Sequence, residues 1–291
     1  MALDNPYPAW EFSKFTLTRH MRGTGGAQAH RPVGRQLGTV ITTPRPTAGR
    51  RPTRTAGGTA VPIPADWPTT EAEALAEQLR LRTLVEPSGP RPDAGALVAG
   101  VDVAYDDERD LVVAAAVLLD HDTLTVVEEA TAVGRIAFPY VSGLLAFREL
   151  PAVLDALAAL THTPDLVACD GYGLAHPRRL GLASHLGVLT GLRTYGVAKS
   201  PFTFAHDTPA AERGSRTPLV DRDSGEEVGC ALRTRAGVKP VFVSAGHRIG
   251  LAEAVDSTLA LARDYRLPET TRRADSLCRR ALTELQSAHH E

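Results

Sequence analysis

The stretch DLVACDGYGLAHPRRLGLASHLGVLTGLRTYGVAKS (165–200) contains the pattern that decides the fold of this chain. Its first six residues form a short apolar run that predicts a buried strand over 165–170, and residues 180–192 have the apolar spacing of a helix. The segment RTYGVA then predicts a second strand over 193–198. This alternation indicates an α/β sheet, and Asp170 stands at the carboxyl end of the first strand, where sites gather in such sheets.

The sequence before this stretch predicts a meander of three antiparallel strands between two helices. Thr69 and Thr70 precede EAEALAEQLRLRTLV, whose early acidic residues and apolar spacing predict a helix over 70–84. Pro151 lies inside a second helical pattern, so that helix either starts or kinks there. The short polar connections DDERD and DHD separate three β-rich runs. The predicted strands are 97–105, 111–119 and 123–133, and the second helix is 144–160.

The sequence after this stretch predicts further strands at 227–234 and 238–244, and helices at 251–264 and 269–286. An antiparallel meander followed by helix–strand units implies one mixed α/β sheet with helices on both faces.

The charge of the chain is distributed unevenly along its length. Residues 1–60 hold nine Lys and Arg against two Asp and Glu, whereas the other residues hold 23 against 32. The first 60 residues are rich in Gly, Pro, Thr and Arg and too poor in large apolar side chains to offset their backbone entropy. We therefore expect a disordered basic extension over 1–60 and a catalytic domain over 61–291. A nucleic-acid-binding arm, a solvated extension and a start codon assigned too early remain open.

Composition excludes several classes of protein. The longest apolar run, 111–119, has nine residues, well short of the ~20 that a membrane helix needs. The first residues lack the basic and apolar regions of a secretory signal. Three widely spaced cysteines, Cys169, Cys230 and Cys278, make no disulfide framework and no CxxC zinc site. We expect a cytoplasmic protein without membrane contact.

Three carboxylates stand out as candidate functional groups. Asp102 lies in the apolar strand LVAGVDVAY, where a charge is costly unless it is paired or bound to a metal. Asp170 ends a strand and is followed by Gly171, and Glu149 lies on the helix after the meander. A ribonuclease-H-like fold uses carboxylates from these three elements to hold Mg²⁺. For each residue alone, a turn-capping or surface role is the simpler explanation.

Four motifs resemble the endonuclease V family, in the same order along the chain. That family has a first strand VAGVD, a segment like PYIPGLLAFRE, then DGxGxxHPRxxGLAsHlG and a closing GVAKS. This chain has VAGVD at 98–102, PYVSGLLAFRE at 139–149, DGYGLAHPRRLGLASHLG at 170–187 and GVAKS at 196–200. The resemblance covers roughly residues 65–287 and implies the ribonuclease-H-like mixed sheet.

The resemblance implies a metal centre with basic groups around it. Asp102, Glu149 and Asp170 would hold Mg²⁺, with Mn²⁺ as a substitute. Lys199 would reach the scissile phosphate, and His176 would orient water or a phosphate, with a core or capping histidine as the alternative. Basic phosphate contacts are expected in the same motif, with a solvated loop face as the alternative: Arg178 and Arg179.

The resemblance also implies a wedge and a base pocket. In the family, the PYIP loop inserts at the lesion; here Pro139 and Tyr140 match, Val141 comes next, and Ser142 replaces the second proline, so a less rigid loop is expected. Backbone amides around the glycine-rich motif would hold the base: Gly171, Gly173 and Leu174.

Two segments near the C-terminus, SAGH (244–247) and TRRAD (271–275), also resemble the family. Asp275 is expected either to support the metal site or to form a helix salt bridge with Arg272 or Arg279.

The activity that this resemblance implies is Mg²⁺-dependent nicking at the second phosphodiester bond 3′ to a deaminated base. The product ends would be 3′-hydroxyl and 5′-phosphate, and the enzyme would be a monomer acting on damaged DNA and on inosine-containing RNA. Two alternatives stay open, namely another ribonuclease-H-like nuclease such as a junction resolvase, and a non-cleaving inosine- or nucleic-acid-binding module.

Overall fold

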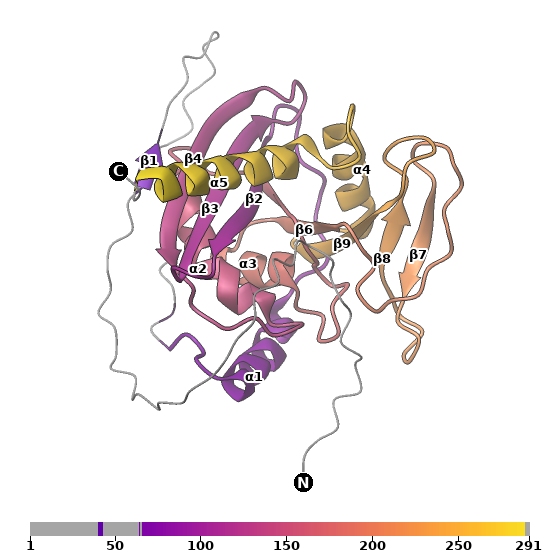
Figure 1. Cartoon of the computed structure of the whole chain (residues 1–291). Helices are drawn as coiled ribbons and strands as arrows, with labels where there is room; N and C mark the ends of the chain where they lie inside the picture. The colour runs from indigo at the N-terminus through magenta and orange to yellow at the C-terminus, as the bar shows by residue number, and fades with distance from the viewer. Residues whose placement is uncertain (1–39, 43–63, 65, 289–291) are drawn as a thin grey trace, which may run out of the picture. The chain divides into compact units, whose positions relative to one another are not determined.

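One mixed sheet of nine strands organises the chain over residues 40–42, 64 and 66–288, the part described in the computed structural model (Figure 1). The strand order is β1-β4-β3-β2-β5-β6-β9-β8-β7. β5 is parallel to β2, β6 is parallel to β5, and the other neighbours are antiparallel. The strands are β1 (Val40–Thr42), β2 (Leu97–Asp106), β3 (Leu111–Asp120), β4 (Val126–Arg135), β5 (Leu166–Cys169), β6 (Thr194–Ala198), β7 (Arg216–Val220), β8 (Glu227–Leu232) and β9 (Val241–His247).

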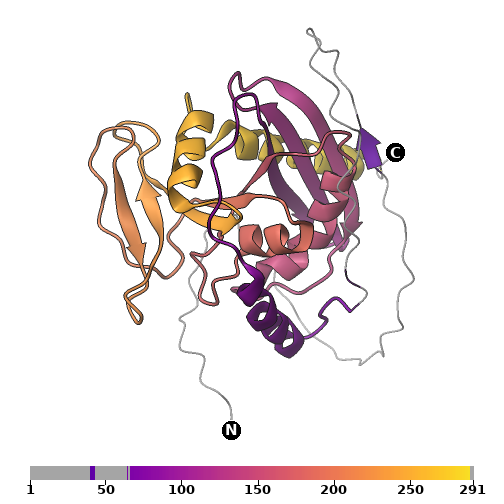
Figure 2. The same ribbon diagram turned by 180° about the vertical axis from the view of Figure 1, so that it is seen from behind.

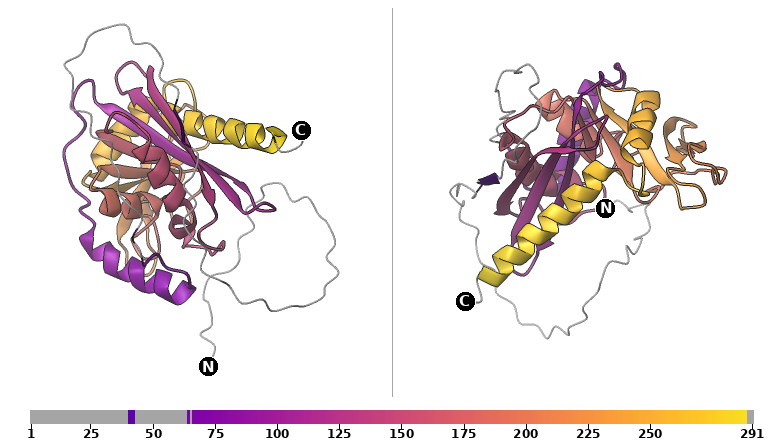
Figure 3. Two further views of the ribbon diagram at one scale, coloured as in Figure 1. Left: turned by 90° about the vertical axis from the view of Figure 1, so that its left-hand side faces the viewer. Right: turned by 90° about the horizontal axis from the view of Figure 1, so that it is seen from above.

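Helices cover both faces of this sheet, as the sequence predicts. On β3, Val112, Ala114 and Ala116 pack with α2 and α3, whereas Val113 and Ala115 pack with α5. Figure 3 shows α5 on one face and the α2 and α3 pair on the other, and Figure 2 shows that pair from behind. The mixed α/β architecture is confirmed. The helices are α1 (Glu71–Leu81), α2 (Leu145–Ala158), α3 (Leu182–Thr190), α4 (Leu251–Leu261) and α5 (Glu269–Ala288), with a 3-10 turn at Arg82–Leu84.

Two strands were not predicted from the sequence. β7 contains Pro218 and lies at the edge of the sheet, where a proline leaves no ladder hydrogen bond unmade. β1 lies within the basic extension and pairs with β4. Apart from 40–42, the extension predicted for residues 1–60 lies outside the described residues.

Helix α2 begins at Leu145 and runs through Pro151, so it does not start at the proline. A proline at this position cannot donate to the carbonyl four residues earlier, that of Phe147. The indole Nε1 of Trp67 donates to this carbonyl at 3.0 Å, so the acceptor is satisfied from outside the helix. The stretch of α2 that carries Glu149 therefore depends on a side chain before α1.

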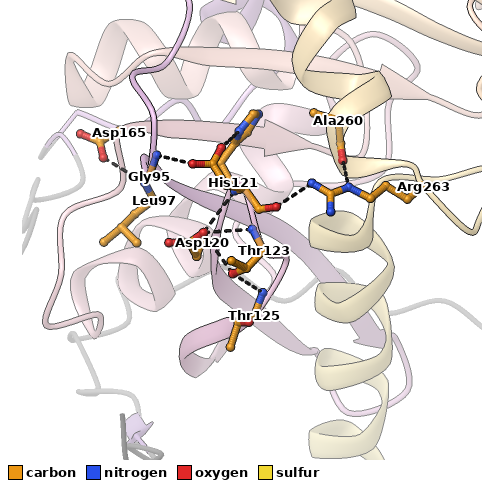
Figure 4. A network of polar contacts seen from close by, with 10 residues as sticks. Gly95, Leu97, Asp120, His121, Thr123, Thr125, Asp165, Ala260 and Arg263 are labelled. Carbon is orange, nitrogen blue, oxygen red and sulfur yellow. Dashed lines mark hydrogen bonds and ion pairs between the residues drawn. The ribbon is translucent and has the colours of Figure 1, made fainter. Parts of the chain in front are cut away.

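The start of β2 is held by a polar network (Figure 4). The Leu97 amide donates to Asp165 Oδ2 at 3.0 Å, and Asp120 Oδ1 accepts from the Thr123 amide at 3.0 Å in the turn after β3. Arg263, just after α4, donates to the Asp122 carbonyl at 2.7 Å. The Gly95 amide, just before β2, donates to Asp122 Oδ2 at 2.6 Å, so the β3–β4 turn is tied both to the start of β2 and to the segment after α4.

All three cysteines, Cys169, Cys230 and Cys278, are free and buried. Within the described residues, no helix combines the length and the apolar character needed to cross a membrane.

A fully buried histidine makes the fold sensitive to acid. His185 on α3 stacks on Trp67 at 5.8 Å between ring centroids and meets the edge of Phe147 at 4.9 Å. Among the described residues, neither ring nitrogen has a hydrogen-bond partner. Burial lowers the pKa of His185 to about 3, so the folded protein keeps this ring neutral at pH values where the unfolded chain protonates it.

We expect the free energy of unfolding to fall between pH 6.5 and 3, and His185→Leu to weaken that dependence. Above the unfolded pKa of about 6.5, both states are neutral; below it the unfolded state binds a proton that the folded state excludes. At pH 5 this amounts to a loss on the order of 2 kcal/mol. Urea unfolding of the wild-type protein and of His185→Leu at pH 7.5 and 5.0 checks this prediction. An equal loss of unfolding free energy in the two proteins would contradict it.

Candidate active site

The strand register brings Asp102 and Asp170 side by side. Val101 of β2 pairs with Cys169 of the parallel strand β5, so the next residue of each strand lies at the same level, about 4.8 Å apart between strands. Burial, and next the charge of Asp170, raise the pKa of Asp102 to about 7. The Val103 amide donates to Asp102 Oδ1 at 2.9 Å and opposes the rise. Two predicted site residues therefore lie close enough for the charge of Asp170 to disfavour ionisation of Asp102.

Glu149 approaches this pair of carboxylates from α2 and is 8% exposed. Tyr105 of β2 donates its hydroxyl proton to Glu149 Oε1 at 2.9 Å. Burial raises the pKa of Glu149 to about 8; the Tyr105 bond opposes this rise, and the charges of Asp102 and Asp170 add to it. Tyr105 was missed in the sequence, although strand alternation from Val101 places it on the α2 side of the sheet.

Lys199 follows β6 and forms an ion pair with Asp170. Burial alone would lower the pKa of Lys199, but the charge and the hydrogen bond of Asp170 outweigh it, and the pKa is raised. The ammonium group therefore lies beside Asp170, with its first partner inside the protein, and its reach to the scissile phosphate stays a prediction.

Asp275 contributes a fourth charge from α5. Arg279 Nε donates to Asp275 Oδ1 at 2.9 Å, which is one of the two salt bridges expected from the sequence. Its charge also raises the pKa of Asp102, after burial and Asp170. Close packing permits this approach: a Cβ on Gly100 would lie 2.7 Å from Thr270 Cβ at the start of α5.

The donor chemistry of this cluster fits a divalent metal ion. Asp102, Glu149 and Asp170 offer carboxylate oxygens from three elements, and their repulsion, with burial, raises the pKa of the first two. Within the described residues, no three His, Cys, Asp or Glu side chains converge closely enough to be a ready ligand set. Glu149 is turned to Tyr105 and Asp170 to Lys199, so those side chains must reorient for all three to share one ion.

The glycine-rich motif after Asp170 is hydrogen-bonded to β9. The Gly173 amide donates to Ser244 Oγ at 2.9 Å, and the Leu174 amide donates to the Ala245 carbonyl at 2.8 Å. Both amides were predicted to hold a base; in this structure they donate to protein acceptors, and their base-binding role, like that of Gly171, stays a prediction. The segment SAGH, noted only as a resemblance in the sequence, supplies both acceptors.

His176 and Arg178 point to the loop before α2. The His176 ring donates from Nε2 to the Gly143 carbonyl at 2.9 Å and accepts the Arg178 amide on Nδ1 at 3.2 Å. Burial, followed by the charge of Arg178, lowers the pKa of His176 to about 3. Arg178 donates from Nη2 to the same carbonyl at 2.9 Å. Both side chains bind the Gly143 carbonyl, and the predicted role of His176 in orienting water or a phosphate stays a prediction.

Arg179 also has protein partners. It pairs with Asp221 at 2.6 Å and Glu226 at 2.7 Å, which joins the motif to the β7–β8 hairpin. The predicted phosphate contacts of Arg178 and Arg179 stay predictions, because both guanidinium groups are bound within the protein here.

The loop 139–143 presents an exposed aromatic side chain next to α2. Tyr140 is 65% exposed, whereas Phe138 just before the loop is 2% exposed. The Leu144 amide donates to the Val141 carbonyl at 2.9 Å and turns the chain into α2. The predicted wedge residues Pro139, Tyr140 and Val141 thus lie on the segment that leads to Glu149.

Comparison with known proteins identifies relatives over most of the described chain. The sequence profile of the family described as Endonuclease V matches residues 75–276. A Streptomyces coelicolor protein named Endonuclease V is 67% identical over 224 residues, covering 76% of this chain and 95% of that protein. The crystal structure of an endonuclease V from Streptomyces avermitilis is 65% identical, has a TM-score of 0.74 and covers 78% of this chain and 99% of its own.

A more distant structure was solved with nucleic acid. An endonuclease V from Ciona intestinalis, in complex with a 24mer DNA containing an inosine followed by a ribo-adenosine, is 29% identical with a TM-score of 0.65. It covers 74% of this chain and 98% of that one.

Proposed function

This chain belongs to the endonuclease V family of nucleases, and on that premise we propose that it repairs DNA by nicking beside deaminated bases with Mg²⁺ as cofactor. The nick falls at the second phosphodiester bond 3′ to deoxyinosine and leaves 3′-hydroxyl and 5′-phosphate ends. The observation that carries this proposal is the β2–β5 register, which brings Asp102 beside Asp170, with Glu149 near enough for their charges to raise its pKa. The inosine-containing DNA held by the Ciona relative supports the substrate class.

The proposed chemistry is hydrolysis at the carboxylate cluster. Asp102, Glu149 and Asp170 would hold the cation, which when bound supplies Lewis acidity and a more acidic water. Tyr105 keeps one oxygen of Glu149 in a fixed position. Lys199 offsets the negative charge that develops on the scissile phosphate.

The loop 139–143 would open the duplex at the lesion. Tyr140 is the exposed ring that can stack where a base leaves the helix, a contact worth ~1–3 kcal/mol. Extrusion costs least at a mispaired or damaged base, which contributes to selectivity. His176 serves this step as a positioning residue, since both of its ring nitrogens bind backbone. We also propose that the protein acts as a cytoplasmic monomer and accepts inosine in RNA.

A nicking assay on a labelled duplex with one deoxyinosine tests this function. With Mg²⁺ or Mn²⁺ we expect one nick beyond the 3′ neighbour of the lesion, and with EDTA none. Binding without any nick would favour the non-cleaving module, and equal cutting of undamaged or branched DNA would favour a general ribonuclease-H-like nuclease.

The basic extension is expected to strengthen binding to nucleic acid at low salt. Deleting residues 1–60 removes nine Lys and Arg against two Asp and Glu, so the apparent Kd should rise at 50 mM salt, whereas the two proteins should converge at high salt. Nicking at saturating enzyme should stay the same. Fluorescence anisotropy over a salt series checks this, and a second variant with Arg45, Arg50, Arg51 and Arg54 changed to Ser separates charge from chain length. An unchanged Kd for nucleic acid at low salt would show that the extension does not contribute to binding.

A further inference from the structure

One backbone carbonyl accepts hydrogen bonds from three side chains at the entrance to α2. The Gly143 carbonyl oxygen accepts hydrogen bonds from Gln78 Nε2, His176 Nε2 and Arg178 Nη2, each with a donor–acceptor distance of 2.9 Å. A carbonyl oxygen has two lone pairs, so three donors, one of them cationic, make this an unusually saturated acceptor. The position of Gly143 is thus fixed from three directions.

Gln78 is the hub of this network. It lies on α1 and is 1% exposed. Its amide group also donates to the Leu180 carbonyl at 3.3 Å, while its Oε1 accepts from Arg178 Nε. One buried side chain therefore joins α1 to the loop before α2 and to the loop before α3. A buried glutamine whose donors and acceptor are all used is costly to replace by an apolar group.

Gly143 has no freedom to shift alone. Its φ is +79°, and a Cβ there would lie 2.8 Å from Arg178 Nη2. The exposed ring of Tyr140 lies three residues before Gly143, and Glu149 lies on the helix that begins just after it. A shift of this carbonyl would displace the loop that carries Tyr140 more than it would displace α2, because α2 is packed along its length in the core.

We propose that Gln78 is a positioning residue that holds the 139–143 loop in the conformation that opens a duplex at the lesion. This inference rests on the proposed function, and it adds a specificity element outside the four motifs. Gln78 lies on α1, and its hydrogen bonds go to Gly143, Leu180 and Arg178, none of which is a carboxylate of the cluster. Its loss should therefore impair base opening more than phosphodiester hydrolysis.

The test compares two substrates under single-turnover conditions. Gln78→Leu should slow nicking of a deoxyinosine in duplex DNA by about tenfold or more, because buried donors and acceptors lose their partners. Nicking of the same deoxyinosine in a single strand, where little opening is needed, should change by less than about threefold. Gln78→Glu keeps the volume and the acceptor for Arg178 but loses both amide donors. It should also lower the ratio of the duplex nicking rate to the single-strand nicking rate.

The matched control is Thr70→Ala. Thr70 caps α1 through a capping box with Glu73, so its loss weakens the same helix without touching Gly143. The control should keep the wild-type ratio of duplex to single-strand rates. A fluorescent 2-aminopurine beside the lesion, read in EDTA, should show less unstacking with Gln78→Leu than with wild type.

Equal slowing on both substrates, an unchanged ratio, or the same ratio change in Thr70→Ala would overturn the inference. Wild-type protein that nicks neither substrate would instead refute the proposed function, so the two failures are told apart by the wild-type lanes.

Discussion

Asp102→Asn is expected to lower the nicking of a deoxyinosine duplex roughly 1000-fold or more while leaving the fold intact. The substitution keeps the shape of the side chain and removes one negative charge from the point where Asp102 and Asp170 meet. A neutral amide is a much poorer ligand for a hard divalent cation.

The same change should not destabilise the protein when no divalent cation is present. Burial and the neighbouring charge of Asp170 raise the pKa of Asp102 to about 7, so above that pH the folded state carries a charge that it disfavours, and the amide relieves this. Single-turnover nicking and urea unfolding at pH 8 in EDTA measure both effects. Asp264→Asn, an exposed carboxyl after α4, is the matched control and should match wild type. Activity within tenfold of wild type would remove Asp102 from the metal site.

The second large effect is expected for Gly173→Ala. An added Cβ would lie 2.6 Å from the Ala245 carbonyl carbon, so the motif loop must lift from β9 and stretch its bonds to Ser244 and Ala245. We expect a loss of about 2–3 kcal/mol in unfolding free energy from this crowding. Because the loop begins at Asp170, a displacement near 1 Å should also lower nicking about 100-fold.

Gly134→Ala on β4 is the control for this substitution. Its added Cβ would meet Val112 and Ala152 at 3.8 and 4.0 Å, which is ordinary contact, so stability and nicking should stay close to wild type. Denaturation midpoints and nicking rates of both variants test whether the motif loop is held against β9. If Gly173→Ala matches Gly134→Ala, the loop is not clamped as described.

Much of the fold could be predicted from local pattern because the apolar runs are long and regular. The run 111–119 alternates between two buried faces, and its strand is confirmed at Leu111–Asp120. β7 was missed because RTPLV is short, polar in part and interrupted by Pro218, features that an edge strand tolerates.

The carboxylates could be recognised in the sequence because a charge in an apolar segment is unusual, whereas the residues that position the site carry no such signal. A charge inside an apolar strand, as at Asp102, is costly and therefore conspicuous. Tyr105 and Gln78 fit their local patterns without conflict, and their importance comes from contacts 44 and 65 residues away in the chain. The amide partners of the glycine-rich motif were predicted differently because β9 lies 71 residues beyond Gly173.

The bond from Trp67 to the Phe147 carbonyl bears on the order in which this protein folds. The turn of α2 around Pro151 lacks one internal hydrogen bond, and its substitute comes from a residue 80 positions earlier. Closing a loop of that length costs chain entropy before any contact can repay it, and such long-range contacts slow folding. The helix that presents Glu149 is therefore completed by tertiary docking of an upstream segment, and the carboxylate cluster forms with the global fold instead of with local helix formation.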